Sequence, residues 1–193
     1  MKKLFIVIFP VLFSFFVKAQ DKVSLPLSVD STIIYQGVVM VDSTYKQNQL
    51  YSQAKEWFAN TFKSAKEVIE SDDELNGRLI GKFTDQGEQT IIGGNAIPQI
   101  CEVTVEIDVK NGKYRYRFYN FNGQSTFFGV VFPINVSERY LMYLHGNFPK
   151  GAFTSKKTLY FTLDEVYSKF NLAMASIINE LSLYMKAVKS DNF

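Results

Sequence analysis

Residues 101–119, CEVTVEIDVKNGKYRYRFY, decide the fold of this chain. Up to Asn111-Gly112, apolar residues alternate strictly with polar or charged ones, and the alternation resumes after that pair. Such alternation predicts strands with one buried face, and Asn-Gly between two of them is the strongest short hairpin signal. The sequence therefore predicts an antiparallel hairpin that turns at residues 111 and 112.

A two-residue turn also determines which residues face one another across this hairpin. The predicted pairs are Lys110 with Lys113, Val109 with Tyr114, Asp108 with Arg115, Ile107 with Tyr116, and Glu106 with Arg117. One face becomes apolar, while the other joins carboxylates to arginines in pairs that contribute about 0.2–1 kcal/mol each. Turn type and side-chain chemistry thus predict the same register.

Two long amphipathic helices are predicted outside the hairpin. The first runs from about Lys46 to Ile69, where apolar residues keep helical spacing on one face. The second runs from about Leu163 to Lys189, with Asp164 and Glu165 suited to the positive N-terminal end of a helix. The expected buried stripe of the second helix is Val166, Phe170, Ala173, Ile177, Leu181, Tyr184 and Val188.

Shorter elements fill the rest of the chain. Strands are expected at residues 33–41, 77–83 and 125–132, the last stopped by Pro133, with a turn at 71–74 and loops at 84–99 and 146–157. Residues 137–146 predict a short helix with Ser137 as its N-cap, and a strand is the alternative. The order of strand, long helix, several antiparallel strands and long helix predicts an α+β sandwich with both long helices on one face.

The N-terminal segment predicts export. Lys2 and Lys3 precede an apolar run of about fourteen residues, and Val17-Lys18-Ala19 suits a signal peptidase. Because about twenty residues are needed to span a bilayer, residues 1–19 are expected to be a cleaved signal peptide, leaving no stable membrane span. The predicted location is periplasmic or secreted. Residues 20–32 are then expected to be a linker or loosely held arm, and residues 33–190 a single domain.

Cleavage changes the charge of the working protein. The full chain carries 21 basic and 19 acidic residues, and residues 1–19 hold three lysines and no acid. The remaining 18 basic and 19 acidic residues leave a net charge of −1. A nearly neutral surface gives no electrostatic reason to expect nucleic acid as a partner.

Several segments between residues 33 and 122 resemble one known family. They are residues 35–39 (YQGVV), 50–51 (LY), 54–55 (AK), 57–58 (WF), 62–69 (FKSAKEVI), 77–82 (GRLIGK) and 112–116 (GKYRY). Together they resemble a domain of unknown function, TATA-binding-protein-like in fold, from exported proteins of Bacteroidota. The resemblance implies a curved antiparallel sheet with helices on its convex side. It implies no activity, and DNA binding does not follow from the fold name.

Catalytic, metal-binding and cofactor-binding residues are not predicted. His145 is the only histidine and has no ligand spacing around it, and Cys101 lies on the apolar face of its strand. Glu102, Glu106 and Asp108 share a strand face, and residues two apart on it lie about 7 Å from one another, a separation that paired carboxylates can exploit. The predicted arginine partners favour an ordinary ion-paired sheet surface instead.

Aromatic side chains near the C-terminal helix are the remaining candidates. The possible ligand or partner surface consists of Tyr140, Tyr143, His145, Phe148 and Phe153. Core or loop packing is the alternative for these aromatics. The leading hypothesis is a non-catalytic binding module of the cell envelope whose partner is an envelope protein or a small ligand. The alternatives are a carboxylate-dependent hydrolase acting on envelope glycans and a structural subunit that adds an edge strand to a partner sheet.

Overall fold

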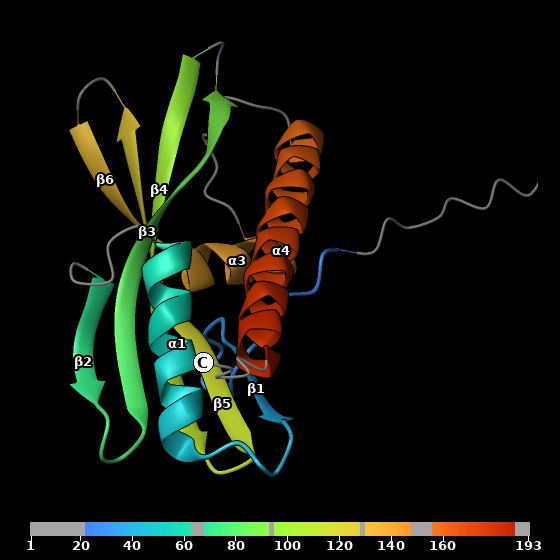
Figure 1. Ribbon diagram of the computed structural model, residues 1–193. Helices are drawn as coiled ribbons and strands as arrows, with labels where there is room; N and C mark the ends of the chain where they lie inside the picture. Colours follow the sequence, from blue (N-terminus) through green and yellow to red (C-terminus); the bar gives the residue numbers. More distant parts are fainter. Residues whose placement is uncertain (1–21, 63–67, 93–94, 128–129, 148–155, 188–193) are drawn as a thin grey trace, which may run out of the picture.

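The computed structural model describes residues 22–62, 68–92, 95–127, 130–147 and 156–187. Its elements are β1 (Tyr35–Met40), α1 (Gln47–Thr61), β2 (Ile69–Asp73), β3 (Arg78–Ile92), β4 (Asn95–Lys110), β5 (Lys113–Phe127), β6 (Val130–Asn135), α3 (Val136–His145) and α4 (Lys156–Lys186). The six strands form one antiparallel sheet, which confirms the predicted α+β class (Figure 1).

The sheet has the strand order β1-β5-β4-β3-β2, and β6 also pairs with β5. Residues 113–118 of β5 pair with β1, and residues 122–127 pair with β6. The two shorter strands therefore follow one another along the same edge of β5 (Figure 1). Between them, Asn120 adopts a positive φ of 55° next to a register shift, which bends the long strand.

The β4–β5 hairpin has the predicted register in all five pairs, from Lys110 opposite Lys113 to Glu106 opposite Arg117. Gly112 has a φ of 68°, the left-handed conformation that the Asn-Gly turn predicts. Ile107 and Val109 are buried on the apolar face. The local alternation pattern was therefore sufficient to define this part of the fold.

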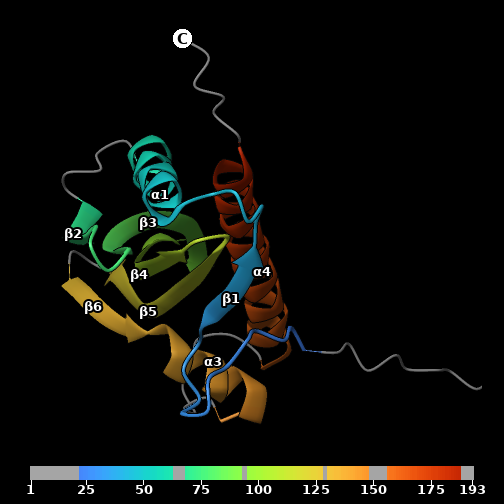
Figure 2. The same ribbon diagram turned by 60° about the horizontal axis from the view of Figure 1, so that its bottom comes forward.

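Helices α1 and α4 cover one face of the sheet, and Figure 2 shows α3 beside the N-terminal segment. Trp57 of α1 is fully buried and makes edge-to-face contacts with Phe58, Phe62 and the β5 residue Phe118. Gly81 permits close approach of α1 to β3, since a Cβ there would lie 2.6 Å from Phe58. An aromatic core thus forms between α1 and the sheet.

Helix α4 begins seven residues earlier than predicted, so Asp164 and Glu165 lie beyond its first turn. The buried stripe is Leu163, Tyr167, Met174, Leu181 and Met185, with Phe170, Ile177 and Tyr184 partly buried. Ala173 is exposed, which corrects the predicted stripe, because the longer Met174 beside it reaches the core. Val188 lies outside the described residues. Of the helices described, α4 included, none is both long and apolar enough to cross a membrane.

The chain after α1 also departs from expectation. In the described part, α1 ends at Thr61, and Ile69–Asp73 is strand β2 rather than the end of a helix and a turn. Asp72 accepts a hydrogen bond from Lys55 at 2.6 Å and another from Tyr51, both on α1. Among the described strands, β2 is an edge strand that pairs with β3 alone. An edge strand needs no apolar alternation, so the sequence of β2 does not resemble a strand.

The predicted loop at 84–99 is wrong, because β3 continues to Ile92 and β4 begins at Asn95. The strand predicted at 125–132 is two strands: β5 ends at Phe127 and β6 begins at Val130. Pro133 lies within β6, opposite Gln124, and does not end it. The missing N–H of proline is tolerated because β6 pairs with β5 alone among the described strands.

Residues 136–145 form the predicted short helix, α3, but its N-cap was misassigned. The Asn135 side chain accepts the Glu138 N–H at 3.0 Å, whereas the Ser137 hydroxyl accepts the Ile33 N–H from the N-terminal segment. Gly146 ends the helix with a φ of 74°. Ser137 does not cap the helix because its hydroxyl accepts the Ile33 N–H, a contact that only the folded chain provides.

Candidate functional site

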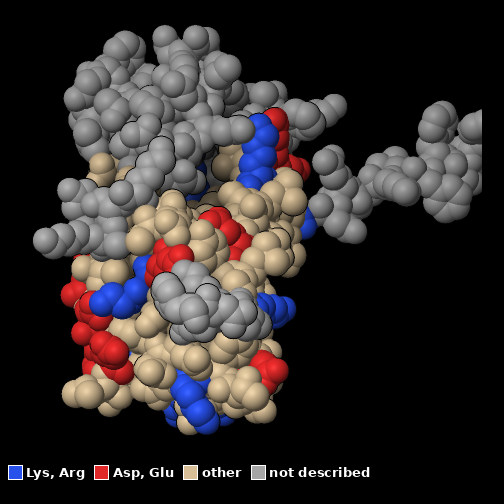
Figure 3. All heavy atoms as spheres, viewed as in Figure 1, with Lys and Arg blue, Asp and Glu red and all other residues tan. Residues whose placement is uncertain are grey.

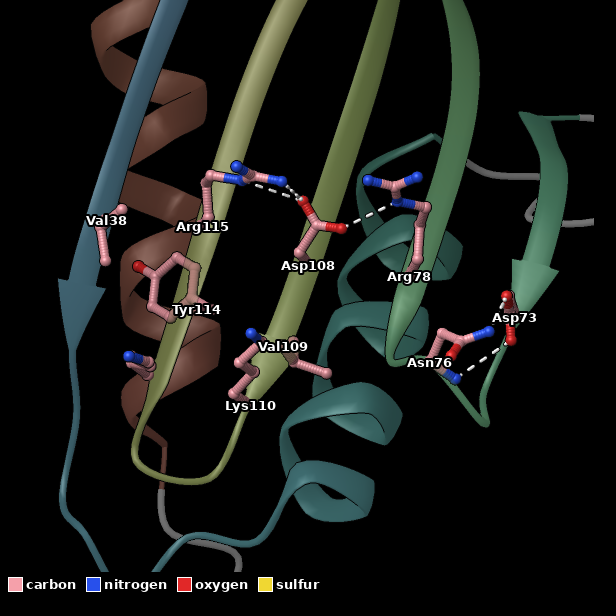
Figure 4. Close-up of a pocket in the computed structure, with 10 residues that line it drawn as sticks. Val38, Asp73, Asn76, Arg78, Asp108, Val109, Lys110, Tyr114 and Arg115 are labelled. Carbon is pink, nitrogen blue, oxygen red and sulfur yellow. Dashed lines mark hydrogen bonds and ion pairs between the residues drawn. The ribbon is translucent and has the colours of Figure 1, made fainter.

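The face of the sheet opposite α1 and α4 carries an ordered row of side chains across five strands. In register order the row is Val38, Arg115, Asp108, Arg78 and Asp73. Figure 4 shows the arginines flanking Asp108, with both helices behind the sheet. We call this surface the open face, comprising this row together with Met40, Lys82, Thr104, Glu106, Lys110, Lys113, Arg117 and Tyr119.

Asp108 is held between two arginines. It accepts hydrogen bonds from Arg78 Nε at 2.9 Å and from Arg115 Nε and Nη2 at 3.0 and 2.7 Å. Burial would raise the pKa of the Asp108 carboxyl, but the hydrogen bonds and charges of both arginines outweigh it and hold that pKa below its usual value. Asp108 is therefore fixed as a carboxylate and is not available as a general acid.

Glu106 lies deeper in the same network and is only 3% exposed. Its carboxylate accepts hydrogen bonds from Arg117 and, at 3.3 Å, from the Tyr119 hydroxyl, and Arg78 Nη2 lies 3.1 Å away. These three long side chains surround a residue that the alternation pattern assigned to the solvent-facing side. Both predicted arginine pairs are present, and Arg78 links the two carboxylates in a way that the hairpin sequence could not indicate.

A hollow of about 530 Å³ lies at the turn end of the β4–β5 hairpin. It is lined by Val38, Asp73, Asn76, Arg78, Asp108, Val109, Lys110, Lys113, Tyr114 and Arg115 (Figure 4). Sequence reasoning placed no site here, although the pairing of Lys110 with Lys113 was a usable signal. Like charges opposite one another destabilise a hairpin, so their presence calls for an explanation.

The lowered pKa of Asp108 predicts a pH-dependent effect of Asp108→Asn. The wild-type carboxylate should add stability above its unfolded pKa of about 3.9, and that stability should be lost as pH falls through the lower folded pKa. Urea unfolding from pH 7 to pH 2 should therefore show a wild-type advantage at pH 6 that shrinks below about pH 4. An advantage that persists unchanged at pH 2 would contradict the assignment.

The predicted aromatic surface is divided by the fold. Tyr140 and Tyr143 lie together in the interior, with ring centroids 5.8 Å apart. His145 is exposed at the last position of α3, and Phe148 and Phe153 lie outside the described residues. Ligand binding by this set stays a prediction, while the two buried tyrosines have an evident structural role.

That role is to hold the N-terminal segment. The Tyr140 hydroxyl accepts the Leu25 N–H at 2.7 Å and donates to the Val23 carbonyl at 2.8 Å, while the Val23 N–H donates to Tyr143 at 2.9 Å. Lys22 Nζ donates to the carbonyls of Tyr143 and Leu144 at 2.9 and 2.6 Å. The described part of the expected linker or arm is therefore held at defined points along α3.

Tyr140→Phe should detach this segment locally. The ring still fits, but the Leu25 N–H and Val23 carbonyl lose their partner, at a cost of about 1–2 kcal/mol. Hydrogen exchange should show faster exchange of the Leu25 amide. Tyr45→Phe is the matched control, since the Tyr45 hydroxyl makes only a 3.4 Å exposed hydrogen bond. Unchanged protection of Leu25 would argue against the proposed role of Tyr140.

Three further observations concern the groups that could serve in catalysis or metal binding. Cys101 is partly buried on the apolar side of β4. Within the described residues, no three His, Cys, Asp or Glu side chains gather closely enough to hold a metal ion. Glu102 shares the strand face of Glu106 and Asp108, and arginines already bind those two carboxylates.

Comparison with known proteins identifies a domain within the chain. Residues 35–124 match the model of a domain of unknown function, DUF4468, with a TBP-like fold. The chain carries a DUF4468 domain. None of the curated proteins compared with the chain matches it.

Solved structures agree on the fold of the DUF4468 domain. A DUF4468 family protein from Bacteroides ovatus superposes with a TM-score of 0.58 at 13% identity, covering 86% of this chain and 92% of its own. A TBP-like protein from Parabacteroides distasonis gives a TM-score of 0.56 at 8% identity, covering 81% and 96%. At such identities these likenesses establish the fold alone.

The matched segment contains the charged row of the open face. Residues 35–124 span β1 to most of β5, including Arg78, Glu106, Asp108 and Arg117. Strand β6, α3 and α4 lie beyond it. The DUF4468 domain therefore supplies the open face, whereas the predicted aromatic set belongs to the C-terminal part of the chain.

Proposed function

We propose that this chain is an exported, non-catalytic binding module of the cell envelope whose binding surface is the open face. The observation that carries the proposal is the arginine network, in which Asp108 and Glu106 are each held by two arginines. Side chains fixed in this way present an ordered pattern of charge without further ordering cost, which favours recognition. The helices cover the other face and leave this one accessible (Figure 4).

The same network weighs against the alternative, a carboxylate-dependent hydrolase acting on envelope glycans. Such an enzyme needs one carboxyl group that can donate a proton and a second that acts as base or nucleophile. Asp108 has a lowered pKa, and Glu106 is buried against Arg78 and Arg117. Asp108 is therefore not arranged to donate a proton at neutral pH, and arginines already bind both carboxylates.

The distribution of charge on the surface and the net charge of the domain favour a protein or small-ligand partner over nucleic acid. Basic and acidic residues are interspersed over the face shown in Figure 3, and all three arginines of the open face form ion pairs with carboxylates. Nucleic-acid binding depends on an excess of unpaired positive charge that neutralises phosphates. The domain without residues 1–19 has a net charge of −1.

A thermal-shift ligand screen tests the binding function. Envelope-derived small molecules should raise the melting temperature of the wild type and of a helix-layer variant, Lys169→Glu, but not of the open-face variant Arg115→Glu. Ligands that stabilise all three proteins equally would place binding elsewhere. Release of reducing sugar from envelope glycans, lost in Asp108→Asn, would favour the hydrolase instead.

Export is tested separately from binding. Expression in a Bacteroidota host, followed by fractionation and N-terminal sequencing, should recover the protein outside the cytoplasm beginning at Gln20. Recovery of an uncleaved chain in the cytoplasm would overturn the export proposal and leave the binding proposal intact.

A further inference from the structure

Two positive charges on the open face have no ion-pair partner among the residues that the structure describes. Arg78, Lys82, Arg115 and Arg117 each form an ion pair with a neighbouring carboxylate. By contrast, the Lys110 and Lys113 side chains, opposite one another next to the turn, form no ion pair with any residue that the structure describes. Uncompensated like charges at paired positions lower hairpin stability, so a binding role would account for them.

The hollow at this end of the hairpin is positive. Four basic side chains line it against two carboxylates, Asp73 and Asp108. Asp108 is occupied by two arginines, and Asp73 accepts hydrogen bonds from the Asn76 N–H at 3.1 Å and side-chain amide at 2.8 Å. Because Asn76 is neutral, Asp73 keeps its negative charge, and the positive charge at the hollow that has no ion pair among the described residues is that of the two lysines.

Exposed apolar side chains border the hollow on the β1 side. Val38 is 64% exposed and pairs with Arg115, and Met40 is 71% exposed and pairs with Lys113. A ligand with both an anionic group and an apolar chain would match the lysines and this apolar border at once. A purely ionic or a purely apolar ligand would use only part of the surface.

We infer that the hollow binds an anionic group, carboxylate or phosphate, that carries an apolar chain. Lys110 and Lys113 contact the anion, with Arg115 beside them, and Val38 and Met40 contact the chain. The inference rests on the proposed binding function of the open face and names the ligand class and the place on that face.

NMR titration of the ¹⁵N-labelled protein tests this inference. Octanoate and octyl phosphate are the anionic probes, which separate a carboxylate from a phosphate source, and octyltrimethylammonium is the cationic probe with the same chain. Amide shifts are expected at residues 110–115 and 38–40. The double variant Lys110→Gln/Lys113→Gln should weaken binding of the preferred anion at least about tenfold, a change that two lost charge-assisted contacts can produce.

The matched control is Lys169→Gln/Lys186→Gln, which removes the same net charge from α4. It should bind as the wild type does and keep the wild-type melting temperature, because Lys169 and Lys186 lie at exposed positions. The Lys110→Gln/Lys113→Gln variant should melt no lower than the wild type, because it loses a like-charge pair at exposed positions. Equal binding of the cation, equal binding by the Lys110 and Lys113 double variant, or no binding of either anion at millimolar concentration would overturn the inference. Shifts confined to the part of the open face around Lys82 and Tyr119 would overturn it too, while leaving the proposed binding function standing.

Discussion

Arg117→Met is expected to lower the free energy of unfolding by about 3 kcal/mol. The Glu106 carboxylate is almost completely buried, and the substitution removes its closest partner. Of its described partners, Arg78 and Tyr119 then remain. A buried charge that loses its partner costs far more than the pair itself contributes. Urea unfolding monitored by circular dichroism measures the change.

Two companion variants separate this mechanism from a general effect of losing an arginine. Arg115→Met makes the same change two residues away, but Asp108 is more exposed and keeps Arg78, so a loss of at most about 1 kcal/mol is expected. Adding Glu106→Met to Arg117→Met removes the stranded carboxylate and should recover half or more of the lost stability. Equal losses in both single variants, or no recovery in the double variant, would contradict the account.

Trp57→Ala is expected to lower the free energy of unfolding by about 3–5 kcal/mol. The indole is fully buried and contacts Phe58, Phe62 and Phe118, so its removal opens a cavity where α1 meets the sheet. Chemical denaturation measures this loss. A cavity of this kind would leave the fold only marginally stable at physiological temperature.

Trp57→Phe should lower the free energy of unfolding much less, by about 1–2 kcal/mol. The buried indole N–H donates to no residue that the structure describes, so phenylalanine removes an unsatisfied donor while it keeps most of the aromatic contact. Asn60→Ala, on the exposed side of α1, should stay within about 0.5 kcal/mol of the wild type. Near-equal effects of alanine at positions 57 and 60 would show that the core lies elsewhere.

Prediction from sequence succeeded where structure depends on neighbouring residues. The hairpin register followed from the Asn111-Gly112 turn and the alternation around it, and α1 followed from helical spacing. It failed where structure depends on a distant strand. Strand β2 has the polar sequence of a turn and exists because β3 offers it backbone partners. Strand β3 continues past residue 84, and β4 begins before the predicted strand, for the same reason, because the two strands pair with each other.

The candidate site shows the same division. The sequence predicted the pairing of Asp108 with Arg115 and of Glu106 with Arg117. It did not predict the hollow, because the row from Val38 to Asp73 draws on strands that lie far apart along the chain. For Tyr140 and Tyr143 it left a ligand surface and core packing as alternatives, and the fold buries both residues against the N-terminal segment.

Local sequence patterns are enough to specify the α+β class, the register of the central hairpin and the apolar face of α1, because alternation, turn type and helical period act between residues close in the chain. The burial of Glu106, the contact of Arg78 with both carboxylates, and the position of Lys110 and Lys113 at a hollow beside Val38 and Met40 follow from the folded sheet alone. These features arise from the pairing of β4 and β5 with β3 and β1, and strand pairing over such separations is set by the packing of the whole sheet.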